Sequence, residues 1–204
     1  MLRTGVAATS VITTSAGETP LSDRHSAEFR ADIAALVGEA RNGDRAAFGR
    51  LYQLHAGLVH GILLARVPRL EVDDLVQEVF LAALRELQGL HNAAAFGAWV
   101  AAIARNRAND FYRRSKETLP PEEDSPIEAA HLDDSAHAEA LEALTAIRNL
   151  PEAYRETLVL RLVEGMTGPE IASRTGLTPE SVRVNLHRGM KMLREALGKG
   201  ASRE

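Results

Sequence analysis

The chain contains 204 residues, of which 45% are apolar and 4% are aromatic, and it has no cysteine. This composition supports one medium-sized domain or two small ones and favours helices that pack through aliphatic side chains. Without cysteine, disulfides and thiolate metal sites are excluded. No apolar run approaches the roughly 20 residues of a transmembrane helix, and residues 1–20 lack the apolar core of a signal peptide. We therefore expect a cytoplasmic protein.

The net charge of −4 conceals a strong segregation of charge along the chain. Residues 98–116 and 183–199 each contain five basic residues and one acidic residue, whereas residues 115–142 contain nine acidic residues and one basic residue. DNA responds to the charge within a Debye length of roughly 10 Å rather than to the total charge of the chain. The two basic segments are therefore compatible with nucleic-acid binding.

The N-terminal half of the chain has helical periodicity after a tail. Residues 1–27 are rich in Thr, Ser, Ala and Gly, and we interpret them as a flexible tail. From about residue 28 to residue 114, apolar residues recur at steps of three and four, with breaks at Asn42-Gly43-Asp44, near Pro68 and at Gly89. The predicted helices span about 28–41, 45–68, 72–89 and 95–114. The third of them is expected to bury Leu75, Val76, Val79, Phe80, Ala83, Leu84 and Leu87.

A change in composition separates the two halves. Residues 117–137 contain three prolines and many acidic residues with little periodicity, which predicts a linker. Helical periodicity resumes at about residue 138 and continues to about residue 198, before a short C-terminal tail at 199–204. With no convincing strand pattern, the sequence predicts an all-α fold of two small helical domains, at 28–116 and 138–198, joined by a flexible acidic linker.

The C-terminal half contains the pattern of a helix-turn-helix. Thr167 and Glu170 have the spacing of a capping box at the start of a short helix. Gly176 supplies a turn, Leu177 is expected to fill the space between the helices, and Thr178 is expected to cap the next helix, with Pro179 at its first position. Basic and amide side chains on the outer face of that second helix suit the major groove of DNA. A solvated basic face on an ordinary helical hairpin is the alternative. The outer residues are Arg183, Asn185, His187, Arg188 and Lys191.

An acidic ridge lies on the third predicted helix, where Asp73, Asp74, Gln77 and Glu78 share one polar face. Asp74 and Glu78 are like charges four positions apart, which costs a few tenths of a kcal/mol unless a basic partner binds there. A solvated face is the simpler interpretation. A metal or acid–base site is disfavoured because no histidine lies at ligand spacing on the same helix. His55 falls on an apolar stripe, which predicts a hydrogen-bonded core histidine.

The fourth predicted helix combines aromatic and basic residues, a mixture that suits single-stranded DNA. Trp99 and Phe111 fall on its apolar stripe and are expected in the core. Asn106 and the arginines at 105, 107, 113 and 114 are the better candidates for contacts with DNA.

Four stretches of the chain, in order, resemble the sigma-70 family of RNA polymerase sigma factors, and specifically its extracytoplasmic-function (ECF) group. They are 43–52, 73–80, 96–106 and 150–194, and the segment from first to last spans roughly three quarters of the chain. The most specific are Asp73-Asp74-Leu75-Val76-Gln77-Glu78-Val79-Phe80 and the helix-turn-helix. The resemblance implies a transcription initiation factor that is not an enzyme and needs no cofactor or metal.

The resemblance also implies partners and a division of labour. The ridge of Asp73, Asp74, Gln77 and Glu78 would dock on the clamp helices of the largest polymerase subunit, and the flap of the polymerase and an anti-sigma factor are further expected partners. The −10 promoter element would be held by His91, Asn92, Phe96, Arg105, Asn106, Arg113 and Arg114. The −35 element would be read by Thr178, Ser181, Arg183, Asn185, His187, Arg188 and Lys191.

Two other hypotheses remain open from the residues alone. A stand-alone helix-turn-helix repressor or activator would explain the C-terminal half but leave the acidic ridge without a role, and it would bind duplex DNA tightly without polymerase. A helical metal-dependent hydrolase using Asp73, Asp74 and histidines would require stoichiometric metal.

Overall fold

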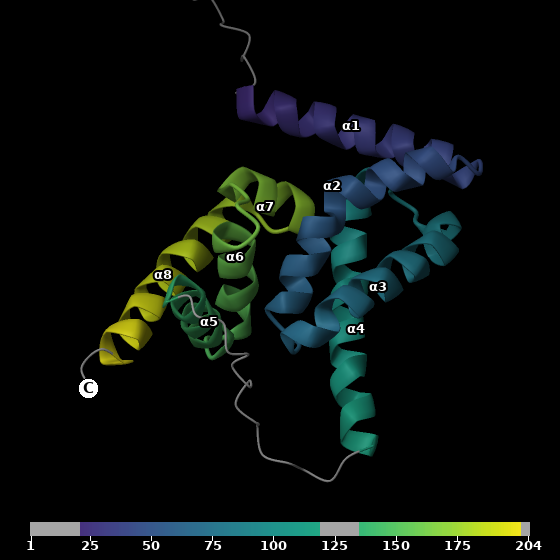
Figure 1. The fold of residues 1–204 in the computed structure, drawn as a ribbon. Coiled ribbons are helices and arrows are strands. Elements are labelled where there is room, and N and C mark those ends of the chain that lie inside the picture. The colour runs from purple at the N-terminus through teal and green to yellow at the C-terminus, as the bar shows by residue number, and fades with distance from the viewer. Residues whose placement is uncertain (1–20, 119–134, 201–204) are drawn as a thin grey trace, which may run out of the picture.

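A computed structural model describes residues 21–118 and 135–200, with the side chains of 27–114 and 139–198. Every element in these ranges is a helix (Figure 1). The predicted all-α class is confirmed, whereas most of the predicted tails and linker lies outside the described residues. The α-helices are α1 (Leu21–Arg41), α2 (Arg45–Leu64), α3 (Val72–Glu86), α4 (Phe96–Thr118), α5 (Ser135–Arg148), α6 (Glu152–Leu162), α7 (Gly168–Thr175) and α8 (Pro179–Gly200), with short 3-10 turns η1 (Arg69–Glu71), η2 (Leu87–Gly89) and η3 (Ala93–Ala95).

The N-terminal unit, α1 to α4, is organised around α2. Asp44 begins this helix by accepting hydrogen bonds from the backbone N–H groups of Ala46 and Ala47, which satisfies donors that have no partner inside the helix. Beyond this cap, α2 packs against α1, α3 and α4. Leu51, Leu58 and Ile62, at helical spacing on α2, are completely buried there.

The C-terminal unit, α5 to α8, contains the predicted helix-turn-helix. The capping box at the start of α7 is confirmed, since Thr167 and Glu170 each bond the backbone N–H of the other. Gly176 ends α7 with a φ of 78°, a left-handed conformation that glycine adopts without a steric cost. Thr178 then accepts a hydrogen bond from the N–H of Ser181 and caps α8.

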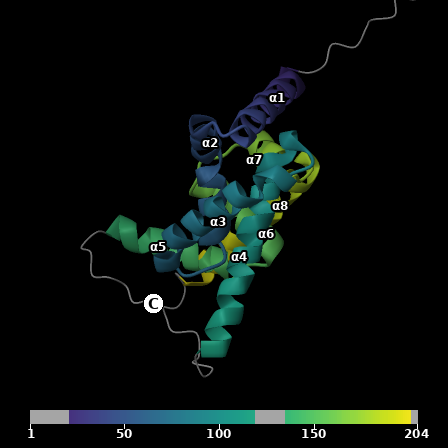
Figure 2. The same ribbon diagram turned by 90° about the vertical axis from the view of Figure 1, so that its right-hand side faces the viewer.

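The two units pack directly against each other. Helix α6 packs against α2 (Figure 1), and both views show the short α7 near the start of α4 (Figures 1 and 2). Buried side chains of the two units, among them Ile62 of α2 and Leu158 of α6, belong to one continuous core. The contacts of this junction are described with the candidate sites below.

The structure differs from the sequence-based expectations in three details. The first helix begins at Leu21, seven residues before the predicted start. Leu84 is 49% exposed rather than buried, since the core needs fewer positions of α3 than its apolar residues offer. Leu177, expected between α7 and α8, is 37% exposed. No helix in the described ranges has both the length and the apolar character to cross a bilayer.

Candidate nucleic-acid interface

The acidic ridge occupies the exposed face of α3. The side chains of Asp73, Asp74, Gln77 and Glu78 are all exposed, and the two aspartates lie in the first turn, where the helix dipole favours negative charge. Leu81 and Leu84 extend this face with apolar surface, each about half exposed. Sequence reasoning missed Leu81, although its position four residues after Gln77 places an apolar residue on the polar face. The ridge therefore combines charge with an apolar end.

The loop before α4 is anchored from the end of α1. Arg41 donates hydrogen bonds to the carbonyl oxygens of Leu87 and Leu90, and Gln88 donates one back to the carbonyl of Arg41. Asn92 accepts from the N–H of Ala94 and so caps η3. These bonds hold residues 90–95 in one position while leaving the side chains of His91 and Asn92 exposed.

Phe96 does not fit its predicted role as a DNA contact. Its side chain is 0% exposed, and its ring packs edge-on against His55 with the ring centroids 5.0 Å apart. At the first position of α4, Phe96 is covered by neighbouring helices, so it orients the loop from within the core. His55 is the predicted core histidine: it is buried and its Nδ1 lies 2.9 Å from the carbonyl oxygen of Leu51. Burial lowers the pKa of His55 to about 4.

The polar residues of α4 differ in what they contact. Asn106 is exposed, and Arg113 forms an ion pair with Asp110 at 3.0 Å within the helix. Arg114 lies 3.9 Å from the ridge residue Glu78. Arg105 is instead turned toward the C-terminal unit. Among the predicted −10 residues, the structure therefore leaves Asn106 and the arginines near the end of α4 on the surface, and holds Arg105 at the junction of the two units.

The outer face of α8 is basic and exposed. His187, Arg188 and Lys191 are exposed, Asn185 is half-buried, and Val182 and Leu193 anchor the opposite face in the core. Arg183 lies 3.5 Å from Glu180, but both side chains are largely exposed, so the pair is readily broken. Thr178 and Ser181 are occupied in capping, with their hydroxyl oxygens 2.8 Å apart. The exposed face of α8 thus carries basic side chains and an amide, while its opposite face is anchored in the core.

An ion-pair cluster joins the two units at Glu156 of α6, which is only 8% exposed. Arg105 donates to it from Nε at 3.1 Å and from Nη2 at 2.6 Å. Arg66, which follows α2, donates to the same carboxylate at 3.2 Å and pairs with Glu152 at 2.6 Å. The hydrogen bonds from Arg105 to Glu156 raise the pKa of the Arg105 guanidinium. Two arginines of one unit are thus neutralised by two glutamates of the other.

Further polar contacts cross the same junction. His60 Nδ1 lies 2.6 Å from Glu164 Oε1, and this hydrogen bond raises the pKa of His60. Arg148 of α5 donates to the carbonyl oxygens of Leu64 and Val67 at 3.0 Å and 2.8 Å, and so satisfies acceptors at the end of α2. Sequence reasoning found none of these contacts. The paired residues are 81 to 104 positions apart, and their charges look like ordinary solvated faces in the sequence.

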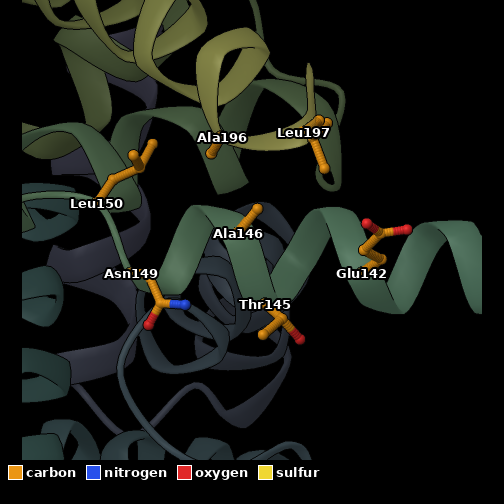
Figure 3. Close-up of a pocket in the computed structure, with 7 residues that line it drawn as sticks. All are labelled: Glu142, Thr145, Ala146, Asn149, Leu150, Ala196 and Leu197. Carbon is orange, nitrogen blue, oxygen red and sulfur yellow. The ribbon is translucent and has the colours of Figure 1, made fainter. Parts of the chain in front are cut away.

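A groove and a smaller hollow are present on the described surface. Figure 3 shows Ala146 of α5 and Ala196 of α8 pointing toward each other across a groove of about 540 Å³. Glu142 is the one titratable side chain that lines it. A smaller hollow of about 270 Å³ lies beside Arg66 and Tyr112 at the junction. Within the described ranges, no group of three or more His, Asp or Glu side chains is placed to hold a metal ion.

Comparisons with known proteins agree with this arrangement. Residues 51–118 match the family model "Sigma-70 region 2", and residues 140–193 match "Sigma-70, region 4". The RNA polymerase sigma factor CarQ of Myxococcus xanthus is 35% identical over 163 residues, which cover 78% of this chain and 93% of CarQ. The ECF RNA polymerase sigma-E factor of Haemophilus influenzae is 31% identical, with coverage of 78% and 92%. The chain belongs to the ECF group of the sigma-70 family.

A solved sigma-factor structure supports the same assignment. CnrH in complex with the cytosolic domain of CnrY has a TM-score of 0.58 and 27% identity, and the match covers 82% of this chain and 98% of that chain. In the present sigma factor, the region 2 match covers most of α2 and all of α3 and α4, and the region 4 match covers α6, α7 and most of α5 and α8. Membership of this family favours a promoter-directing sigma factor over a stand-alone repressor.

Proposed function

We propose that this sigma factor docks on core RNA polymerase through the acidic ridge of α3 and divides promoter recognition between its two regions. The observation that carries the proposal is the pairing, in one chain, of an exposed acidic ridge in region 2 with an exposed basic helix face in region 4. The ridge suits a basic protein surface, and the α8 face suits DNA.

The ridge would bind the clamp helices of the largest polymerase subunit. Opposite charges on the partner convert the repulsion between Asp74 and Glu78 into attraction. Leu81 and Leu84 add apolar surface whose burial stabilises the contact, at about 25 cal/mol per Å². The proposed contact therefore accounts for two leucines that are exposed rather than buried in the core.

Region 2 would hold the unpaired −10 strand at the anchored loop and along α4. His91, Asn92 and Asn106 present hydrogen-bonding groups, and Arg113 and Arg114 lie near the end of α4, where they can meet phosphates. Phe96 is left out of this surface because it is buried. Its role is to position the loop and the start of α4.

Region 4 would read the −35 element with α8 in the major groove. Arg188 and Arg183 can pair with guanine edges and Asn185 with adenine, each good bidentate contact contributing roughly 1–3 kcal/mol of discrimination. Thr178 and Ser181 hold the start of the helix, and Lys191 would bind a phosphate.

The factor would work without catalytic chemistry of its own, in the cytoplasm where polymerase and promoters meet. CnrH binds a cytosolic domain of a partner protein, CnrY. We propose that an anti-sigma protein likewise binds and inhibits the present sigma factor.

A transcription assay with a charge-matched control tests the docking surface. Asp74→Arg combined with Glu78→Arg is compared with Asp32→Arg combined with Glu39→Arg, which makes the same change of charge at exposed positions of α1. We expect the wild type and the α1 variant to be retained by core polymerase and to start run-off transcripts, and the α3 variant to do neither. Equal retention of both variants would refute the ridge as docking surface. Failure of the wild type to bind core, with a shift of duplex DNA by the factor alone, would favour the repressor.

A further inference from the structure

We propose that Gly189 of α8 is a positioning residue for promoter recognition. Because it has no side chain, α8 lies close against α6, and this close approach sets the position of the base-reading side chains. Gly189 is on the buried face of the helix, so it acts through Arg188 and Asn185 rather than by touching DNA. This inference rests on the proposed function, because it concerns how accurately α8 reads the −35 element.

A glycine is unfavourable where Gly189 lies, near the middle of an unbroken helix. The conformation of the backbone does not require it, because the described glycines with a positive φ are Gly43, Gly165 and Gly176. Helix propensity alone would therefore favour alanine at this position. The reason for a glycine is found instead in how α8 packs against α6 (Figure 1).

The two helices are closest together at Gly189. A Cβ atom placed there would lie 3.0 Å from Leu158 Cδ1, 3.1 Å from Leu158 Cγ and 3.2 Å from Tyr154 Cβ. Carbon atoms in contact are ordinarily about 3.5–4.0 Å apart, so these distances are too short by about half an ångström. Tyr154 and Leu158 are four positions apart on α6 and so form one ridge of that helix. Gly189 provides the groove that receives this ridge.

Neither residue of this ridge can easily make room for a side chain at position 189. Leu158 is 0% exposed and belongs to the continuous core, where close packing leaves little space for another rotamer. The Cβ atom of Tyr154 is bonded directly to the backbone of α6, so it cannot rotate out of the way. A methyl group on α8 at this point would therefore push the two helices apart by about half an ångström.

The buried face of α8 is anchored on both sides of this point. Val182, toward the start of the helix, is 1% exposed, and Leu193, toward its end, is 5% exposed. With these two contacts in place, a push at Gly189 displaces the middle of α8 from α6. Arg188 is the neighbour of Gly189, and Asn185 precedes it by one turn. Both side chains would move relative to the rest of region 4.

A displacement of this size matters more for base contacts than for phosphate contacts. A bidentate contact needs two hydrogen bonds to be in range at the same time. Asn185 has a short side chain and is half-buried, so it cannot compensate for a shift of its own backbone. Lys191 carries a point charge on a long flexible stem and can follow a phosphate. The effect should therefore appear in discrimination between sequences rather than in overall binding.

A promoter library measures this discrimination directly. Duplex promoters randomised at the −10 and −35 positions are transcribed by core polymerase carrying the full-length factor, and the run-off transcripts are counted by sequencing. We expect Gly189→Ala to reduce the −35 preference, the ratio of the best sequences to the library mean, at least about fivefold, as for the loss of one bidentate contact. The −10 preference should stay at the wild-type value. Gly198→Ala, on the same helix with nothing within 4 Å of a placed Cβ atom, is the matched control and should retain both preferences.

A substitution on α6 should rescue the variant. Leu158→Ala removes the Cγ and Cδ1 atoms that a Cβ atom at position 189 would meet. We expect Gly189→Ala combined with Leu158→Ala to recover −35 preference, and to unfold at a higher urea concentration than Leu158→Ala alone, because the new methyl group fills part of the cavity. A folded double variant with no better −35 preference than Gly189→Ala would show that the contact with α6 is not the cause. The comparison with Gly198→Ala does not depend on how the Leu158 variants fold.

The wild type separates a failure of this proposal from a failure of the proposed function. If wild type binds core polymerase but transcribes all −35 sequences equally, α8 does not read that element and the proposed function fails. If wild type discriminates and Gly189→Ala discriminates equally well, the positioning proposal is overturned. Loss of the −10 and −35 preferences together, or of binding to core, would show that Gly189 serves only folding, and would overturn it too.

Discussion

Arg105 of region 2 and Glu156 of region 4 lie 51 positions apart and are joined by two hydrogen bonds, of 3.1 Å and 2.6 Å. The carboxylate is largely buried, and Arg66 supplies a third hydrogen bond. Charge-assisted pairs of this kind are roughly twice as strong as neutral hydrogen bonds. The pair therefore links the two promoter-reading regions at a residue that we assign to the −10 strand.

Neutralising Glu156 should weaken this contact between the two regions. We expect Glu156→Gln to lower the free energy of unfolding by about 1.5–3 kcal/mol, because Arg105 and Arg66 lose their charge-assisted hydrogen bonds to the carboxylate. Urea unfolding measures this loss. Glu142→Gln, at an exposed carboxylate of α5, makes the same charge change and should have little effect. Equal losses in both variants would mean that net charge alone acts.

Arg188 should carry specificity for the −35 element. Arg188→Ala is expected to reduce transcription from a cognate promoter roughly 5- to 150-fold. The reason is the loss of a bidentate contact to a base, which contributes about 1–3 kcal/mol to recognition. On a promoter with a scrambled −35 element, wild type and variant should be equally weak. Arg194→Ala, an exposed arginine further along α8, is the control. A similar loss at both promoters would assign Arg188 to phosphate binding.

The buried His55 should make stability fall in acid. Its pKa is about 4 in the folded protein and 6.5 as the ordinary value, so below pH 6.5 the unfolded chain binds a proton that the folded chain does not. Stability is therefore lost as the pH falls from 6.5 to 4, by about 3 kcal/mol. Urea unfolding measures this loss, and His55→Leu should show a shallower decline over the same range. Parallel curves for both proteins would exclude His55 as the cause.

The contact between His60 and Glu164 should make stability depend on pH in the opposite direction. The pKa of His60 is raised above 6.5 by its hydrogen bond to Glu164 and by the charges of Glu164 and Asp73, against the effects of burial and Arg69. The contribution of this contact to stability is therefore complete below pH 6.5 and is lost as the pH rises through the raised pKa. We expect the free energy of unfolding, measured with urea, to decrease over that range in wild type and not in His60→Phe. A free energy of unfolding that does not change with pH above 6.5 in wild type would contradict this.

The capping box should stabilise the helix-turn-helix. Thr167→Ala removes the hydroxyl that accepts from the N–H of Glu170, and caps of this type contribute about 1 kcal/mol. We expect a loss of that size in thermal or urea unfolding. Thr145→Ala, at an exposed position within α5, should be neutral or slightly stabilising because alanine is the better helix former. Equal effects of the two substitutions would argue against the cap.

Local features of this protein could be predicted from the sequence because they arise within a few residues. The capping box at Thr167, the left-handed turn at Gly176 and the cap at Thr178 each involve groups at most four positions apart. The burial of His55 followed from its place on an apolar stripe. The acidic face of α3 followed from helical spacing in the same way, although its role remains a proposal.

The tertiary structure determines which partner each helix face contacts. Apolar periodicity shows which side of a helix is buried, but not which helix covers it, because many amphipathic faces are equally suitable partners. Phe96 lies at a position expected to meet DNA and is buried against His55. Arg105 has the sequence signature of a solvated arginine and is paired with Glu156. Whether a residue near a helix end or on a polar face contacts solvent, DNA or another helix depends on how the helices pack, and here that packing brings regions 2 and 4 together.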